Sequence, residues 1–227
     1  MARHTKLEVI KKIVESGIIP VFFFPDLTTV KKISNACADG GAMVLEFTNR
    51  GDKAFELFGK LIEWRDTASP ELVIGAGTII DAPTASIYVN NGAEFIVGPN
   101  FNPEVAQICN RRKILYVPGC MTPSEISNAE QSGADIIKVF PARVLTPFFI
   151  KAFLGPSPHS KLLPSGGITF RKEDVQGWIK AGATAINLGT DLISNDIIAK
   201  GDFQKLANMT HDCITWVKEA RGQASSF

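Results

Sequence analysis

The chain has 227 residues, of which 45% are hydrophobic and 21% are charged, and its formal net charge is +1. This composition is typical of a globular protein, and the length fits one large domain or two small ones. The near-neutral charge argues against a nucleic acid partner, which would require a basic surface. We expect no membrane partner either, because no apolar stretch approaches the roughly 18 residues of a membrane span and the first residues do not resemble a signal peptide.

The cysteines and histidines are few and scattered. The four cysteines form no Cys-x-x-Cys pair, which is typical of reduced thiols in a cytoplasmic protein. The three histidines have no spacing to carboxylates that would indicate a metal site. The sequence therefore predicts a cytoplasmic protein with no metal site and no cofactor. These residues are Cys37, Cys109, Cys120 and Cys213, and His4, His159 and His211.

Eight short apolar runs alternate with helical segments along the chain. Four of the runs belong to an imperfect repeat, in which a helix ends at a glycine and a strand follows. The helical segments include 28–38 and 52–64, whose apolar residues recur at helical spacing, and a segment that begins at Thr122 with Pro123 and a capping-box Glu125. In chain order, the predicted strands are Ile18–Phe24, Met43–Leu45, Leu72–Ile74, Glu94–Val97, Ile114–Val117, Asp135–Ile137, Lys161–Leu163 and Thr184–Leu188.

This alternation indicates a parallel α/β fold. The repeat favours a closed (β/α)8 TIM barrel over an open sheet, because its copies begin about 40–50 residues apart and each leaves room for two strand–helix units. We expect residues 1–227 to form this single domain, with an N-terminal helix before the first strand and a C-terminal helix after the last. No long linker or low-complexity segment interrupts the pattern.

Charged side chains stand where the second strand ends. Active sites of such barrels lie at the C-terminal ends of the strands. Glu46 is a charge within an apolar strand, and alternation places it on the same side as Val44. A carboxylate there could move protons or form a structural ion pair with Lys138 or Arg50. Arg50 follows in the loop, where its planar guanidinium either binds a substrate carboxylate or faces solvent.

Thr78 follows the third strand, directly after Gly75-Ala76-Gly77. Small residues let the backbone approach a ligand closely. The Thr78 hydroxyl could bind the same carboxylate as Arg50, or it could cap the next helix, for which Asp81 is a second candidate.

Lys138 extends the apolar run of the sixth strand, where a lysine is unusual. A buried ammonium group is costly unless it is paired, and one escape from that cost is to lose the proton. An unprotonated lysine in an apolar pocket is a nucleophile toward carbonyls, which is the start of Schiff-base chemistry. The alternative is a lysine whose stem carries the charge to solvent at the end of the strand.

Glycine-rich turns follow the last two strands, with Ser165-Gly166-Gly167 after the seventh and Gly189-Thr190 after the eighth. Loops at these two places often form a phosphate site in (β/α)8 barrels, through exposed backbone N–H groups. Two ordinary tight turns would have a similar sequence. Taken together, the two turns favour a phosphate-binding end of the site.

Four motifs, in this order and on these strands, make the chain resemble the class I aldolases that cleave 2-keto-3-deoxy-6-phosphogluconate or 4-hydroxy-2-oxoglutarate. The resemblance covers about Ile18 to Leu192, nearly the whole predicted barrel. No single motif is decisive, but all four together are hard to explain by chance. The motifs are Glu46-Phe47-Thr48-Asn49-Arg50, Gly75-Ala76-Gly77-Thr78, Lys138-Val139-Phe140-Pro141-Ala142 and Pro164-Ser165-Gly166-Gly167-Ile168.

The resemblance implies a role for each matching residue. Lys138 would form the Schiff base with the 2-keto carbon, and Glu46 would be the general acid and base. Arg50 and Thr78 would hold the carboxylate of the pyruvyl group. Family members are commonly homotrimers and need no metal. The other implied substrate-binding residues are Pro99 and Phe140 beside pyruvate, and Ser165, Gly166, Gly167, Gly189 and Thr190 toward the phosphate.

The activity implied is that of a metal-independent lyase that splits a 2-keto-3-deoxy-6-phospho sugar acid. The products would be pyruvate and an aldehyde, which is glyceraldehyde 3-phosphate for the phosphogluconate. Ser165 and Thr190 replace the threonine and serine usual in the family, which leaves the far end of the substrate open. Two alternatives therefore stand: an aldolase for an unphosphorylated substrate such as 4-hydroxy-2-oxoglutarate, and a barrel that binds a phosphorylated metabolite without cleaving it.

Overall fold

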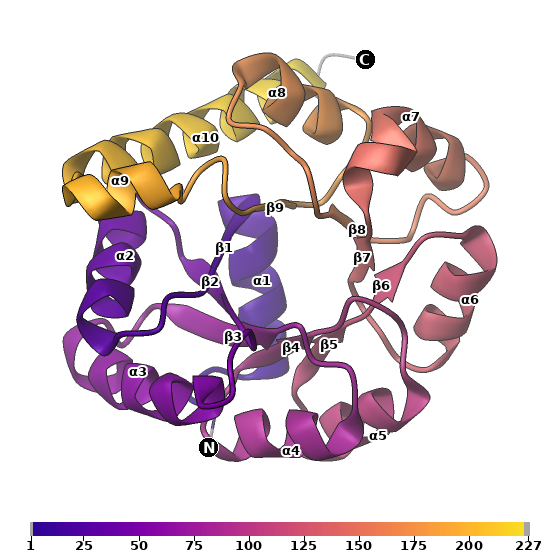
Figure 1. Ribbon diagram of the computed structural model, residues 1–227. Helices are drawn as coiled ribbons and strands as arrows, with labels where there is room; N and C mark the ends of the chain where they lie inside the picture. Colours follow the sequence, from indigo (N-terminus) through magenta and orange to yellow (C-terminus); the bar gives the residue numbers. More distant parts are fainter. Residues whose placement is uncertain (1, 225–227) are drawn as a thin grey trace.

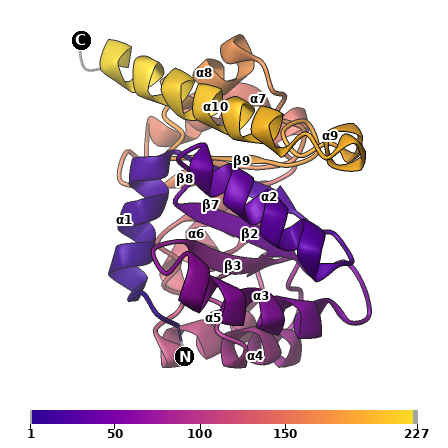
Figure 2. The same ribbon diagram turned by 90° about the vertical axis from the view of Figure 1, so that its left-hand side faces the viewer.

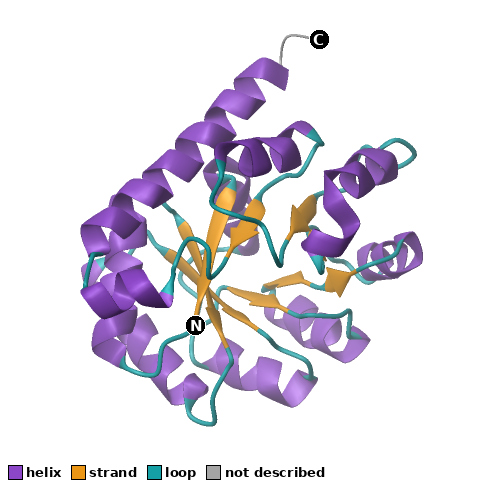
Figure 3. Cartoon of the chain, turned by 45° about the horizontal axis from the view of Figure 1, so that its top comes forward, coloured by secondary structure: helices purple, strands orange, loops and turns teal. Residues whose placement is uncertain are grey.

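The computed structural model describes residues 2–224, in which strands at the centre alternate with helices on the outside (Figures 1 and 3). The strands are β1 (Ile18–Phe22), β2 (Val44–Thr48), β3 (Val73–Gly77), β4 (Phe95–Val97), β5 (Leu115–Val117), β6 (Gly119–Cys120), β7 (Ile137–Val139), β8 (Leu162–Pro164) and β9 (Ile186–Leu188). The helices are α1 (Lys6–Ser16), α2 (Leu27–Asp39), α3 (Ala54–Ala68), α4 (Ala82–Asn90), α5 (Pro103–Arg112), α6 (Pro123–Gln131), α7 (Ala142–Leu154), α8 (Lys172–Lys180), α9 (Asn195–Lys200) and α10 (Phe203–Ala224). Met1 and residues 225–227, which the predicted domain includes, lie outside the described residues.

Hydrogen bonds between the strands form two parallel sheets. The larger has the order β5-β4-β3-β2-β1-β9, and the smaller has the order β6-β7-β8. The predicted fifth strand, Ile114–Val117, is β5, and the unpredicted short strand β6 follows it after Pro118, which has no N–H to donate to a ladder. A single parallel bridge joins Ser165, after β8, to Asn187 in β9. The α/β class is thus confirmed, and the strand ladder runs in two pieces.

The helix boundaries follow the capping chemistry in the sequence. Asp26 caps α2, its side chain accepting from the backbone N–H of Thr29. Thr122 and Glu125 form the predicted capping box at the start of α6. The expected helices at 28–38 and 52–64 are α2 and α3, shifted by a few residues at their ends. A glycine with positive φ ends each helix of the repeat, as a left-handed C-terminal turn requires; these are Gly41, Gly92, Gly133 and Gly182.

Alternation along the strands sorts their side chains into two apolar clusters. One lies between the strands and the outer helices and contains Leu45. The other contains Val9 and Ile13 of α1, which lies at the amino-terminal ends of the strands (Figure 2). We call it the inner cluster; its strand-side members are Ile19, Val44, Val73, Phe95, Val97, Leu115, Val117, Ile136, Leu163 and Ala185. It forms an apolar floor at one end of the strands.

A group of paired charges lies at the same end of the molecule. The Glu94 carboxylate, immediately before β4, forms a buried ion pair with Arg65 of α3. It also accepts from the backbone N–H of Ile74 at 3.1 Å and from that of His4 at 2.9 Å, and His4 Nδ1 lies 2.7 Å from it. We call His4, Arg65 and Glu94 the Glu94 cluster.

No helix within residues 2–224 is long and apolar enough to cross a bilayer. The same residues contain no group of three or more His, Cys, Asp or Glu side chains arranged to hold a metal ion.

Candidate active site

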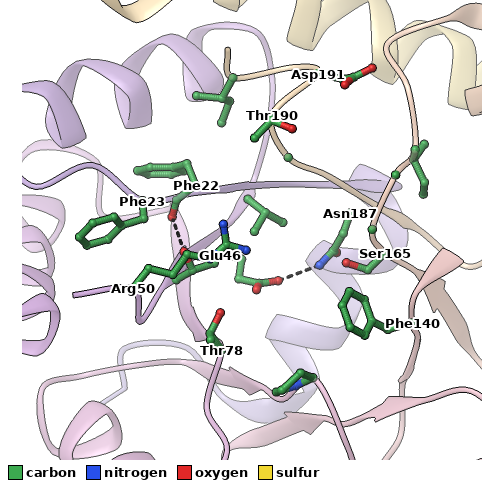
Figure 4. A pocket seen from close by; sticks show the side chains of 18 of the residues that line it. Phe22, Phe23, Glu46, Arg50, Thr78, Phe140, Ser165, Asn187, Thr190 and Asp191 are labelled. Carbon is green, nitrogen blue, oxygen red and sulfur yellow. Dashed lines mark hydrogen bonds between the residues drawn. The ribbon is translucent and has the colours of Figure 1, made fainter. Parts of the chain in front are cut away.

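A cavity of about 580 Å³ opens at the carboxyl-terminal ends of the strands. Its lining includes all eleven residues that the sequence singles out as catalytic or substrate-binding. They come from loops and strand ends spread over the chain, and the fold brings them to one place (Figure 4). They are Glu46, Arg50, Thr78, Pro99, Lys138, Phe140, Ser165, Gly166, Gly167, Gly189 and Thr190.

Glu46 points into the cavity from the middle of β2. Val44, two residues earlier, belongs to the inner cluster, and Leu45 belongs to the outer one, so the predicted alternation is confirmed. The Glu46 side chain is buried, with the residue only 1% exposed. Its carboxylate accepts a hydrogen bond of 2.7 Å from Nδ2 of Asn187 (Figure 4). Within the described chain, no cation lies within 4.0 Å of this carboxylate.

Lys138 is the second buried charged residue of the cavity. It is 7% exposed, so the interpretation as a lysine that reaches solvent is wrong. Its Nζ lies 5.1 Å from the ring centre of Phe140 and, in the part of the chain described here, has no acidic partner within 4.0 Å. The ion-pair alternatives for Glu46, with Lys138 or with Arg50, are therefore not formed. The lysine amine is held in the cavity wall beside an aromatic face, and the unpaired carboxylate of Glu46 lines the same cavity.

Arg50 and Thr78 form the rim on the β2 and β3 side. Arg50 is exposed. Thr78 has φ +62°, a left-handed conformation that is a genuine outlier for a β-branched residue and that clusters at functional sites. The cap of α4 is Asp81, whose side chain accepts from Thr84, so Thr78 does not serve as the cap. Its hydroxyl is left available to a ligand.

The glycines before Thr78 make room for side chains of the protein itself. A Cβ on Gly75 would collide with the ring of Phe95, and one on Gly77 would collide with Oε1 of Glu46. The small residues at this strand end therefore let buried side chains pack against the backbone. Gly77 influences ligand binding only indirectly, because it determines where the Glu46 carboxylate can lie.

Main-chain groups dominate the opposite end of the cavity. Gly166 and Gly167 have φ values of +90° and +86°. Across residues 2–224, the backbone N–H groups of Gly167 and Thr190 donate to no backbone acceptor. Two free donors on the lining of one cavity can bind an anion or a polar oxygen.

Several lining residues were not predicted from the sequence. Val21 to Phe24, at the end of β1, line the cavity but are apolar like any core strand. Asn187 could have been found, because it is a polar residue two positions after the inward-facing Ala185. Asp191 places an exposed carboxylate beside Thr190 (Figure 4).

The cysteines provide no competing nucleophile. All four are buried and free, and burial raises the pKa of each thiol to about 12. Since the thiolate is the reactive form, these thiols are inert near neutral pH. Among the described residues that line the cavity, Lys138 is the one lysine.

Known proteins resemble the chain over nearly its whole length. The family model "KDPG and KHG aldolase" matches residues 9–209. The chain is 25% identical over 216 residues to the 2-dehydro-3-deoxy-phosphogluconate aldolase of Haemophilus influenzae, covering 95% of this chain and 99% of that one. It is 28% identical over 208 residues to the enzyme of the same name from Pseudomonas aeruginosa, covering 91% and 92%.

A solved structure agrees with these relatives. The KDPG aldolase of Legionella pneumophila, with pyruvate captured at low pH as a covalent carbinolamine, matches with a TM-score of 0.81 and 25% identity, covering 90% of this chain and 97% of that one. The matched family model spans the cavity, the inner cluster and most of the helices. The chain therefore belongs to the KDPG and KHG aldolase family and is a lyase, an aldolase of the metal-independent class I type.

Proposed function

We propose that this protein cleaves a 2-keto-3-deoxy-6-phospho sugar acid into pyruvate and an aldehyde through a Schiff base on Lys138. With the phosphogluconate as substrate, the aldehyde is glyceraldehyde 3-phosphate. The observation that carries the proposal is the buried amine of Lys138, which has no acidic partner and shares a cavity with the unpaired carboxylate of Glu46. The names of the relatives and the covalent pyruvate of the Legionella enzyme support it.

The first half of the reaction builds the iminium. The unprotonated amine of Lys138 adds to the 2-keto carbon, and the carbonyl oxygen takes up a proton to give a carbinolamine. Glu46 delivers a second proton to the departing hydroxyl, which leaves as water, and the carbon–nitrogen double bond forms. The cationic iminium is then an electron sink next to the bond that must break.

The second half breaks the carbon chain. Glu46, directly or through water, takes the proton of the C4 hydroxyl, and the electron pair of the C3–C4 bond moves into the iminium. The aldehyde leaves, and an enamine of pyruvate stays on Lys138. Protonation at C3 and hydrolysis of the iminium release pyruvate and return the free lysine.

The two ends of the cavity suit the two ends of such a substrate. At the pyruvyl end, Arg50 and Thr78 would hold the carboxylate, because a guanidinium and a hydroxyl are good donors to it, while Pro99 and Phe140 pack against the methyl side. At the other end, the phosphate would accept from the free N–H groups of the two glycine-rich turns. Those turns contain Ser165, Gly166 and Gly167, and Gly189 and Thr190.

The decisive experiment is intact-protein mass spectrometry after incubation with pyruvate and borohydride. Reduction converts the iminium to a stable secondary amine, so we expect a gain of one reduced pyruvyl unit that peptide mapping assigns to Lys138. No gain in folded protein would remove the Schiff-base proposal and leave binding of a phosphorylated metabolite without cleavage. A gain on another lysine would remove the assignment to Lys138.

A second substrate class is supported by one observation. Asp191 places an exposed carboxylate beside Thr190 at the end where the phosphate would bind, and like charges there repel. An unphosphorylated substrate such as 4-hydroxy-2-oxoglutarate weakens that repulsion, because its far end carries one carboxylate charge in place of the larger charge of a phosphate, and the family name includes it. The comparison of kcat/KM for the two substrates decides between them, and competitive inhibition by inorganic phosphate would favour the phosphorylated one.

We also infer a closed (β/α)8 barrel, one domain over residues 1–227, a homotrimer and a cytoplasmic location. The bridge between Ser165 and Asn187 supports closure, and so does the inner cluster, which contains residues from strands of both sheets.

The homotrimer is supported by Val144 and Phe148 of α7, which are 64% and 77% exposed and offer an apolar face to a second copy. The free cysteines fit a reducing compartment. Light scattering at known concentration tests the trimer.

A further inference from the structure

Asn187 is the one described residue that donates a hydrogen bond to the Glu46 carboxylate. It lies in the middle of β9, and its side chain faces the cavity rather than the outer helices (Figure 4). The donor is Nδ2, and the 2.7 Å distance to Oε2 is that of a strong hydrogen bond to a charged acceptor. Both residues are almost fully buried, at 2% exposed for Asn187 and 1% for Glu46.

The amide keeps this position at a cost. Its oxygen, Oδ1, is buried and has no hydrogen-bond partner within the described structure. A buried acceptor without a partner loses its hydration and gains nothing in return, so an apolar side chain would be the better choice for stability alone. The neighbours of Asn187 in the strand, Ile186 and Leu188, are apolar. The hydrogen bond to Glu46 is the interaction that explains an amide here.

The backbone of Asn187 is fixed from both sides. It pairs with Ile19 of β1 and forms the bridge to Ser165 after β8. On the far side of Glu46, Gly77 leaves just enough room for Oε1. The Glu46 carboxylate is therefore held between the side chain of Asn187 in β9 and the backbone of Gly77 in β3. These two strands set its position in the cavity.

We propose that Asn187 is a positioning residue that holds Glu46 for proton transfer to and from the intermediates on Lys138. The proposal rests on the proposed function and deepens it. The step that should depend most on Asn187 is proton transfer between C3 of bound pyruvate and Glu46. There the iminium gives a C3 proton to Glu46, the electron pair becomes the enamine double bond, and the proton returns by the reverse path.

The test uses pyruvate alone, in heavy water, with Asn187→Leu. Proton NMR follows replacement of the methyl hydrogens of pyruvate by deuterium, which requires Glu46 but no aldehyde. We expect the maximal exchange rate to fall about 10–100-fold, the range expected when a charged group loses its hydrogen bond. The concentration of pyruvate at half-maximal rate should stay close to the wild-type value, because the carboxylate of pyruvate is held by other residues.

Borohydride trapping separates this proposal from the proposed function. If wild-type protein is not labelled by pyruvate, the proposed function fails. If Asn187→Leu is labelled to the wild-type end point yet exchanges at the wild-type rate, the positioning role is overturned and the Schiff base stands. Full labelling with slow exchange supports the positioning role.

A second variant keeps the test sharp if the leucine disturbs folding. Asn187→Asp has nearly the same shape, but its side chain donates only when protonated. Its exchange rate should therefore fall as the pH rises, with a limb that the wild type lacks. Identical pH profiles for Asn187→Asp and wild type would overturn the role.

Asn49→Leu is the matched control. Asn49 follows β2 and accepts a hydrogen bond of 2.9 Å from Tyr88, so this change removes one side-chain hydrogen bond near the cavity without touching Glu46. Its exchange rate should stay near the wild-type value. A fall equal to that of Asn187→Leu would show that any lost hydrogen bond near the site slows exchange, and would overturn the specific role of Asn187.

Discussion

Two buried carboxylates lie at opposite ends of the strands and have opposite surroundings. Glu94, at the amino-terminal end, is paired with Arg65 and accepts hydrogen bonds from two backbone N–H groups and from His4. Glu46, at the carboxyl-terminal end, has one neutral donor and no cation within 4.0 Å among the described residues. The sequence around each is similar, since both are single acidic residues in apolar strands or at their edges.

The difference separates two kinds of buried charge. A buried charge that is fully paired makes the fold depend on each partner, because removing one partner leaves the other charge buried and uncompensated. A buried charge that is left almost without partners can change its protonation state during a reaction. Lys138 follows the second pattern, because it is buried and has no acidic partner. The following changes test whether the two ends separate stability from catalysis.

The largest effect on activity is expected from Lys138→Met. The change keeps the length and the apolar stem but removes the amine, so cleavage should fall by at least roughly 10⁴-fold, as loss of a covalent nucleophile does. Steady-state kinetics measures the fall, and thermal unfolding shows whether the fold survives. Lys161→Met is the control, since Lys161 is exposed at the start of β8. Substantial activity in Lys138→Met would show that the amine is not the nucleophile.

Glu46→Gln should slow turnover by roughly 10²–10⁴-fold, the usual range for a general acid and base. Glutamine keeps the size and can still accept the hydrogen bond from Asn187, so the free energy of unfolding should change little. Stopped-flow or steady-state assays of pyruvate release give the rate, and urea unfolding gives the stability. A Glu46→Gln variant that is unstable but fully active would show that Glu46 serves stability and not catalysis.

The same substitution at the other end should have the opposite result. Glu94→Gln removes the buried ion-pair partner of Arg65 and leaves it only the exposed carboxylate of Asp66, 3.0 Å from its Nε, so we expect a loss of about 3 kcal/mol of unfolding free energy. The kcat of the folded protein should stay near that of the wild type, because the Glu94 cluster is remote from the cavity lining. Arg65→Leu combined with Glu94→Gln should recover part of the loss, since no buried charge is then left alone. Wild-type stability in Glu94→Gln would mean that the pairing is not structural.

The smallest effect is expected from thiol alkylation of the native protein. Burial raises the pKa of all four thiols to about 12, so near neutral pH they are protonated and unreactive. Mass spectrometry after iodoacetamide treatment should show no adduct in native protein and four adducts in denaturant. Rapid labelling of a native thiol would show that the interior around it opens more easily than the structure indicates.

Much of the fold and site is readable from local pattern. The alternation of Val44, Leu45 and Glu46 identifies which side chains face inward, and the Thr122–Glu125 capping box places the start of α6. The eleven predicted residues line one cavity, because the segments that follow parallel strands meet at the same end of the fold.

The remainder depends on contacts between distant segments. The hydrogen bond from Asn187 to Glu46 joins residues 141 positions apart. The alternation of residues along one strand does not predict a partner on another strand. Whether Glu46 pairs with Lys138 or Arg50 also depends on distances across the cavity that spacing cannot supply. The short strand β6 after Pro118 was not predicted, because its place in the ladder depends on pairing with β7.

The inner cluster beneath the cavity also bears on the order in which molecules enter and leave it. Val9 and Ile13 of α1 close the inner cluster at the amino-terminal ends of the strands, so molecules enter and leave among the loops at the other end. Lys138 is buried, whereas Gly167 and Thr190 are exposed at the mouth. A molecule bound to Lys138 therefore lies deeper in the cavity than a group bound at the two glycine-rich turns. Under the proposed reaction, the aldehyde therefore departs before pyruvate in cleavage, and pyruvate arrives first in synthesis.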